Sequence, residues 1–144
     1  MKRLSRLICM LLAAALLLAV PAAATENPEP RASNYFMSSD VYLYQTSGNQ
    51  FQAWFEVSAL GIMDKVGASE IKIQESSDDE NWTTVKTCTM SGYSNLICEN
   101  TGAHASYVSY TGTTGKYYRA KITLYAENSN GTGEWTRYTS SIRL

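Results

Sequence analysis

The sequence predicts an all-β fold of about seven strands, arranged as an antiparallel two-sheet sandwich. Three observations favour this class. Apolar and polar residues alternate through several short segments, and helical spacing of apolar residues is not sustained after residue 24. Turn-forming Gly, Asn, Asp and Ser residues separate the segments at regular intervals, which is typical of sandwiches.

Residues 1–24 have the pattern of an export signal peptide, which we expect to be helical. A basic start is followed by the apolar run Leu7–Val20 and by small residues that end at Ala24, the kind of site that signal peptidase accepts. We therefore expect cleavage near Ala24 and a secreted, extracellular protein. The polar, Pro-containing residues 25–34 are predicted to be a disordered lead-in, and residues 35–144 a single domain.

The charge of the exported chain limits its partners. After cleavage it would carry nine basic and thirteen acidic residues, a net charge of −4. Nucleic acids and anionic lipids are bound by basic surfaces, so neither is an expected partner. No second apolar run approaches the length of a membrane span, so we expect no membrane association once the signal peptide is removed. We also expect the protein to be a monomer. The expected partner is an unknown extracellular protein or glycan.

The first half of the domain is predicted to contain three strands. Val41–Tyr44 is short and ends at a Ser-Gly-Asn turn. Gln50–Ala59 alternates strictly, so that Trp54 falls on the outward face. Gly61–Ser69 is expected to be a loop, because Gly, Asp and Lys interrupt the alternation. The third strand follows at Glu70–Glu75, with its two isoleucines inward.

The second half is predicted to add the remaining strands. The acidic turn Ser76–Asn81 leads to Trp82–Thr89, which is expected to return as a hairpin through Leu96–Glu99. Ala105–Tyr110 comes next and ends at a Thr/Gly turn. The clearest segment, Tyr118–Ala126, alternates throughout and is followed by a Gly/Asn/Ser turn and a closing strand at the C-terminus.

Two cysteines, Cys88 and Cys98, remain after Cys9 leaves with the signal peptide. In an oxidising compartment an even, close pair indicates a disulfide. A hairpin with its turn centred on Tyr93 would place Cys88 opposite Cys98, at a separation that a bridge can span. The alternative is a redox-active pair, but that would need a Cys-x-x-Cys spacing or a neighbour that favours the thiolate.

The sequence indicates no catalytic centre, no cofactor and no resident metal. His104 is the one histidine, so a triad or zinc site lacks partners, and we expect it in a loop or at a strand start. Asp78–Glu80 could offer oxygen ligands to calcium, but a solvated turn in which Asp78 bonds the backbone is favoured. Glycan hydrolysis would need two paired carboxylates, and nothing pairs the candidates Glu56, Glu70, Glu75 and Glu99.

Outward-facing aromatic residues are the candidate contact surface. If Val41 and Leu43 are core residues, Tyr42 and Tyr44 point outward on the strand beside Trp54. Aromatic side chains on an open sheet face are used for stacking on sugars and on protein partners. The alternative is that another part of the chain covers Trp54.

Residues 115–122, Gly-Lys-Tyr-Tyr-Arg-Ala-Lys-Ile, resemble the strand of fibronectin type III and immunoglobulin-like domains that begins with a corner tyrosine. By alternation this residue would be Tyr118, whose hydroxyl would fix the preceding loop. Ile71–Val85 is similar to a strand–turn–strand pair of the same modules. The inward Trp of those domains is replaced here by Phe55, and a cysteine hairpin is not typical of fibronectin modules.

From Arg31 onward the chain also resembles a family of small exported proteins of Gram-positive, Firmicutes-type gut bacteria, which is a domain of unknown function. The segments that carry this resemblance are 30–33, 54–57, 63–68, 82–87 and 115–118. The resemblance implies export and a single domain, and it transfers no catalytic residue. We expect a secreted, non-enzymatic binding module. The alternatives are a small secreted hydrolase of glycans or cell walls and a toxin-like secreted product.

Overall fold

The computed structural model describes residues 34–144, so the predicted signal peptide and all but the last residue of the lead-in lie outside it. The described chain is all-β and antiparallel with seven strands, which confirms the prediction at that level. No helix within 34–144 has the length and apolar character needed to cross a membrane. The elements are β1 (Phe36–Ser47), β2 (Gln50–Ser76), β3 (Thr83–Thr89), the 3-10 helix η2 (Ser94–Leu96), β4 (Ile97–Thr111), β5 (Tyr117–Asn128), β6 (Gly131–Tyr138) and β7 (Ile142–Arg143).

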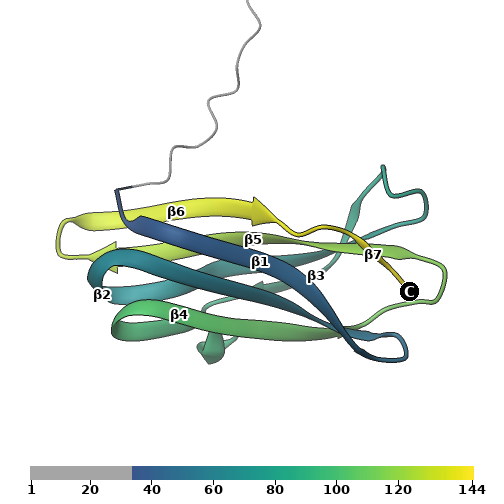
Figure 1. Cartoon of the computed structure of the whole chain (residues 1–144), viewed down its shortest axis with the longest axis horizontal. Coiled ribbons are helices and arrows are strands. Elements are labelled where there is room, and N and C mark those ends of the chain that lie inside the picture. The colour runs from purple at the N-terminus through teal and green to yellow at the C-terminus, as the bar shows by residue number, and fades with distance from the viewer. Residues whose placement is uncertain (1–33) are drawn as a thin grey trace, which may run out of the picture.

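Strand β2 is 27 residues long and doubles back on itself. Its first part pairs with β1 and with the second part of β4, whereas its second part pairs with β5, β3 and the start of β4. Both ends of β2 lie at the same end of the molecule. Asn49, just before β2, donates to Thr114 over 2.9 Å, and Ser77, just after it, contacts Lys116. Figure 1 shows the ribbon of β2 turning back at the opposite end.

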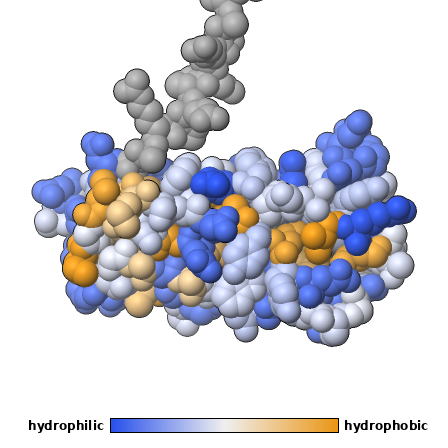
Figure 2. All heavy atoms as spheres, viewed as in Figure 1, coloured by the Kyte–Doolittle hydropathy of each residue, from blue (hydrophilic) through white to orange (hydrophobic). Residues whose placement is uncertain are grey.

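The turn of β2 is made together with β4. The ladder between these strands is interrupted between Ser58 and Met63, where both change direction. Gly61 and Gly102 meet there, because a Cβ on Gly102 would lie 3.1 Å from the Gly61 carbonyl oxygen. The predicted loop over residues 61–69 is wrong, since β2 continues through it. Figure 2 shows a group of apolar atoms at this end, where Ile62 is exposed.

Inward-facing side chains of both parts of β2 meet in one core. The ring of Phe51, on the first part, lies 5.2 Å from the ring of Tyr118 on β5, which pairs with the second part. Most buried residues alternate along their strands with exposed or half-buried ones, as a sheet with one covered face requires, although Val66, Gly67 and Ala68 are buried in succession. The largest of them are Tyr118, Phe51, Phe55, Ile71, Ile73, Leu96, Ile122, Leu124, Val66 and Cys88.

Tyr118 fixes the loop between β4 and β5. Its side chain is fully buried, and its hydroxyl accepts a hydrogen bond from the Thr113 amide over 2.8 Å and donates one to Glu75. Burial, and next the bond to Glu75, raise the pKa of this phenol. The loop lies directly on the ring, since a Cβ on Gly112 would come within 2.7 Å of it. This is the kind of contact that a corner tyrosine makes.

Candidate functional site

The outer face of β1, the first part of β2 and the second part of β4 carries a row of three aromatic residues. The ladder places Tyr42 directly opposite Trp54, and Trp54 directly opposite Tyr107. The rings of Tyr42 and Trp54 are stacked with centroids 6.2 Å apart, and those of Trp54 and Tyr107 are tilted with centroids 4.6 Å apart. We call these three residues the aromatic row.

The aromatic row is outward because its strand neighbours are inward. Phe55 is fully buried next to Trp54, and Val108 is buried next to Tyr107. Tyr42 and Tyr107 are 36% and 38% exposed, whereas Trp54 between them is half-buried. The central ring therefore presents less of its surface to solvent than the outer two. Its indole Nε1 donates to the Gln52 side chain over 2.9 Å, which holds the ring in place.

Two carboxylates lie beside the aromatic row. Asp40 and Glu56 are directly opposite each other across the β1–β2 ladder, and both are exposed. The Tyr42 hydroxyl donates to Glu56 over 3.5 Å. Burial raises the pKa of Tyr42, and the charges of Glu56 and Asp40 raise it further, because they disfavour the phenolate. We call Asp40 and Glu56 the acidic pair.

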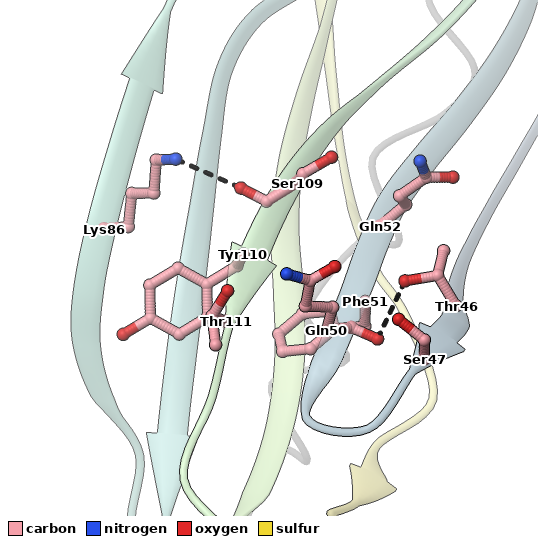
Figure 3. Close-up of a pocket in the computed structure, with 9 residues that line it drawn as sticks. All are labelled: Thr46, Ser47, Gln50, Phe51, Gln52, Lys86, Ser109, Tyr110 and Thr111. Atoms are coloured by element: carbon pink, nitrogen blue, oxygen red, sulfur yellow. Dashed lines mark hydrogen bonds between the residues drawn. The ribbon is translucent and has the colours of Figure 1, made fainter.

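Polar, uncharged residues lie on the other side of the aromatic row. Two positions further along the three strands, the next residues on this face are Tyr44, Gln52 and Ser109, which lie opposite one another in the ladder. Beyond them an open hollow of about 580 Å³ lies at the end of the strands, shown in Figure 3. The Lys86 ammonium reaches across to it from β3 and donates to the Ser109 carbonyl over 3.1 Å. The hollow is lined by Thr46, Ser47, Gln50, Phe51, Gln52, Lys86, Ser109, Tyr110 and Thr111.

The residues selected from the sequence share one face. Tyr44 is 58% exposed and lies one row from Trp54 and Tyr42. The sequence did not single out Tyr107 as part of this surface. Its outward direction follows from the inward Val108, but its place beside Trp54 depends on the register between β2 and β4, which local pattern does not contain.

The predicted disulfide is wrong, because both Cys88 and Cys98 are free thiols. The hairpin that would have brought them together does not form. β3 and the start of β4 instead lie one after the other along the same edge of β2, where Cys88 is opposite Ile71 and Cys98 is opposite Val66. Those partners are five residues apart on one strand, roughly 16 Å, whereas a bridge needs Cα atoms within about 7 Å.

Other candidate ligands in the sequence have structural partners. Asp78 accepts hydrogen bonds from the backbone amides of Glu80 and Asn81 and from the Ser76 hydroxyl, as expected for a turn. Bonds from Asn81 and Ser76 hold the pKa of this carboxyl well below its usual range. Within residues 34–144 no three His, Cys, Asp or Glu side chains are grouped so that they could hold a metal ion.

His104 lines a small open hollow together with Glu56, whereas the other candidate glutamates have partners elsewhere. The prediction of a loop or strand start for His104 is wrong, because it lies in the middle of β4, where its Nε2 is 2.8 Å from the Asn95 carbonyl oxygen. Of the glutamates, Glu75 accepts from Tyr118 and Glu70 pairs with Lys72. Glu99 is opposite Lys65 at the start of β4, away from the acidic pair.

No protein-family model matches the chain, and no curated protein sequence matches it. Among solved structures, the crystal structure of Spo0M, a sporulation control protein from Bacillus subtilis, is similar with a TM-score of 0.38 and 13% sequence identity. The match covers 72% of this chain and 49% of Spo0M, so the chain spans about half the length of that protein. A likeness of this degree carries no argument about fold family or function.

Proposed function

We propose that the chain is a secreted, non-enzymatic binding module that uses the outer face of β1, β2 and β4 to contact an extracellular protein or glycan. The observation that carries the proposal is the aromatic row, three cross-strand aromatic residues on an open sheet face. Tyr and Trp supply large contact areas at low entropic cost, and they are enriched where proteins bind partners. The predicted signal peptide and the resemblance to small exported proteins favour an extracellular setting.

The proposal includes a two-sheet, immunoglobulin-like or fibronectin type III-like sandwich. The doubling back of β2, the shared core around Phe51 and Tyr118, and the loop contact of the Tyr118 hydroxyl with Thr113 support this fold. In such a sandwich each sheet has one inner and one outer face. The aromatic row would then lie on the outer face of one sheet, free for a partner.

The proposal is tested by mapping binding on ¹⁵N-labelled Thr25–Leu144 by NMR. Cellohexaose, chitohexaose and a panel of purified extracellular proteins serve as probes. We expect at least one probe to shift the Trp54 indole signal, and the double variant Tyr42→Ala/Tyr107→Ala and the variant Trp54→Ala to lose that binding. Tyr138→Ala is the matched control, because Tyr138 is 50% exposed but lies on β6, outside this face.

Two outcomes would contradict the proposal. A ligand that the Trp54 and Tyr42/Tyr107 variants bind with full affinity would show that the contact surface lies elsewhere. If chromatography detects shorter sugars released from cellohexaose or chitohexaose, the result would favour the hydrolase alternative over a binding module.

A further inference from the structure

The acidic pair is a feature that the fold itself does not explain. Asp40 and Glu56 are direct cross-strand partners, and like charges in that position destabilise a sheet. Among residues 34–144 no lysine or arginine forms a salt bridge with either carboxylate, although two other ion pairs are present. Among the described residues, the Asp40 carboxylate accepts a hydrogen bond from the adjacent Val41 amide, and Glu56 accepts one from the Tyr42 hydroxyl. Both keep most of their hydrogen-bonding capacity for another group.

Two described arginines, Arg119 on β5 and Arg137 on β6, make their contacts away from the acidic pair. Arg119 stacks on Trp82 and on Tyr138, at 4.3 and 5.0 Å from the ring centroids, on the part of the sheet formed by β3, β5 and β6. Arg137 reaches β1 but donates to the Ser39 hydroxyl over 2.9 Å and stacks on Trp135. Neither arginine pairs with Asp40 or Glu56, so within residues 34–144 the acidic pair has no salt-bridge partner, although Lys86 lies on the far side of the aromatic row.

We infer that the acidic pair and the aromatic row together bind an arginine-bearing, extended segment of a partner protein. The inference rests on the proposed function and names the chemistry of the partner. A guanidinium can donate two parallel hydrogen bonds to carboxylate oxygens, and it also stacks on aromatic rings. Both kinds of group are present here in adjacent rows. A lysine ammonium lacks the planar fork and should bind less well.

The spacing of the two rows fits an extended peptide. Asp40 and Tyr42 are two residues apart on β1, and Glu56 and Trp54 are two residues apart on β2. Alternate side chains of a strand are separated by about 7 Å, and so are alternate side chains of an extended peptide. A segment with arginines at alternate positions that runs along the strands can place one guanidinium on the carboxylates and the next on the rings.

The test uses Thr25–Leu144 and four capped hexapeptides in which Gly alternates with Arg, Lys, Gln or Glu. NMR titration follows the Trp54 indole and the amides of Asp40 and Glu56. We expect the Arg peptide to bind most tightly, the Lys peptide several-fold more weakly, and the Gln and Glu peptides not at all. Binding should weaken as salt is raised, because exposed charges are screened.

A pair of charge-matched variants distinguishes this site from general attraction to an acidic protein. Asp40→Asn/Glu56→Gln should weaken binding of the Arg peptide at least about tenfold, equivalent to about 1.4 kcal/mol. Asp64→Asn/Glu99→Gln removes the same charge from two other exposed carboxylates and should change binding less than twofold. Equal loss in both variants would overturn the inference. Thermal unfolding of each variant shows that it remains folded.

The remaining outcomes separate the inference from the proposed function. If the Gln peptide or a neutral oligosaccharide shifts Trp54 as strongly as the Arg peptide, the surface binds ligands but the cationic partner is wrong. If none of the four peptides binds while another probe does, the inference fails and the proposed function stands. If no probe of any kind binds, both fail. Self-association in sedimentation that Asp40→Asn/Glu56→Gln abolishes would identify a second copy as the occupant and overturn the partner assigned here.

Discussion

Replacement of Tyr118 by Phe tests how the chain stabilises the loop between β4 and β5. The substitution removes only the hydroxyl, which accepts from the Thr113 amide and donates to Glu75. The ring contacts with Phe51 and Tyr110, at 5.2 and 5.9 Å between centroids, remain possible in the variant. Any loss of stability therefore reports on the two hydrogen bonds and not on a cavity.

The size of the loss follows from what each bond leaves behind. Glu75 is half-buried, and a hydrogen bond to a charged group contributes about 1.5–3 kcal/mol. Thr113 is exposed, so water can replace part of its lost bond. We expect Tyr118→Phe to lower the free energy of unfolding by about 2 kcal/mol. In a domain of roughly 110 residues, each kcal/mol lowers the melting temperature by about 4 °C, so the expected shift is about 8 °C.

Urea and thermal unfolding of Thr25–Leu144 measure this loss. Tyr44→Phe is the matched control, because Tyr44 is 58% exposed and its variant should stay within about 0.5 kcal/mol of the original protein. The double variant with Glu75→Gln should lose little beyond Tyr118→Phe alone, since the hydroxyl that Glu75 accepts from is already absent. A melting temperature for Tyr118→Phe within 2 °C of the original would refute the assignment of the corner hydroxyl as a stabilising contact.

Three further predictions concern the backbone, the thiols and the acidic turn. Gly67→Ala should lower the free energy of unfolding by more than about 3 kcal/mol, because Gly67 has φ +155° and a Cβ there would collide with a backbone carbonyl. Gly61→Ala is the control, since a Cβ on Gly61 meets nothing within 4 Å. Equal urea midpoints for the two alanine variants would contradict this prediction. Intact mass and alkylation should find Cys88 and Cys98 reduced. Half-buried Cys98 should be alkylated first, and buried Cys88 only after denaturation. A mass lower by two hydrogens than that of the reduced protein would contradict this prediction. Asp78→Ala should destabilise the protein at pH 7 but progressively less below about pH 4. The reason is that a carboxyl whose pKa is lowered by folding stabilises the protein above its unfolded-state pKa and loses that contribution as the pH falls. A difference in urea midpoints that does not change with pH would contradict this prediction.

The strands predicted best are those whose two faces meet different surroundings. The predicted Tyr118–Ala126 corresponds to β5, in which buried and half-buried residues alternate from end to end. The same pattern placed Trp54 outward and Phe55 inward in β2. Turns at residues 77–82 and 129–130 were also readable, because Asp, Asn and Gly favour the backbone conformations that turns need.

The features that the sequence did not predict depend on distant partners. Residues 61–69 lack a strand pattern of their own, but Lys65 is held between Glu99 of β4 and Glu127 of β5. The disulfide failed for the same reason, since the register of Cys88 and Cys98 is set by β2 and not by the segment between them. The position of Tyr107 beside Trp54 is another long-range pairing. Local alternation decides which face a side chain takes, and register decides which neighbours it meets.

The doubled β2 also determines how the domain can come apart. In the described sheet, β1, β3, β4 and β5 all pair directly with β2, whereas β6 and β7 pair with β5. No group of strands on either part of the folded sheet can therefore detach without exposing the core of the other part. We expect amide hydrogen exchange around Phe55 and around Ile71 to proceed only through complete unfolding, with one common free energy. The protein should thus behave as a single cooperative unit, and a fragment that ends at the turn of β2 should not fold.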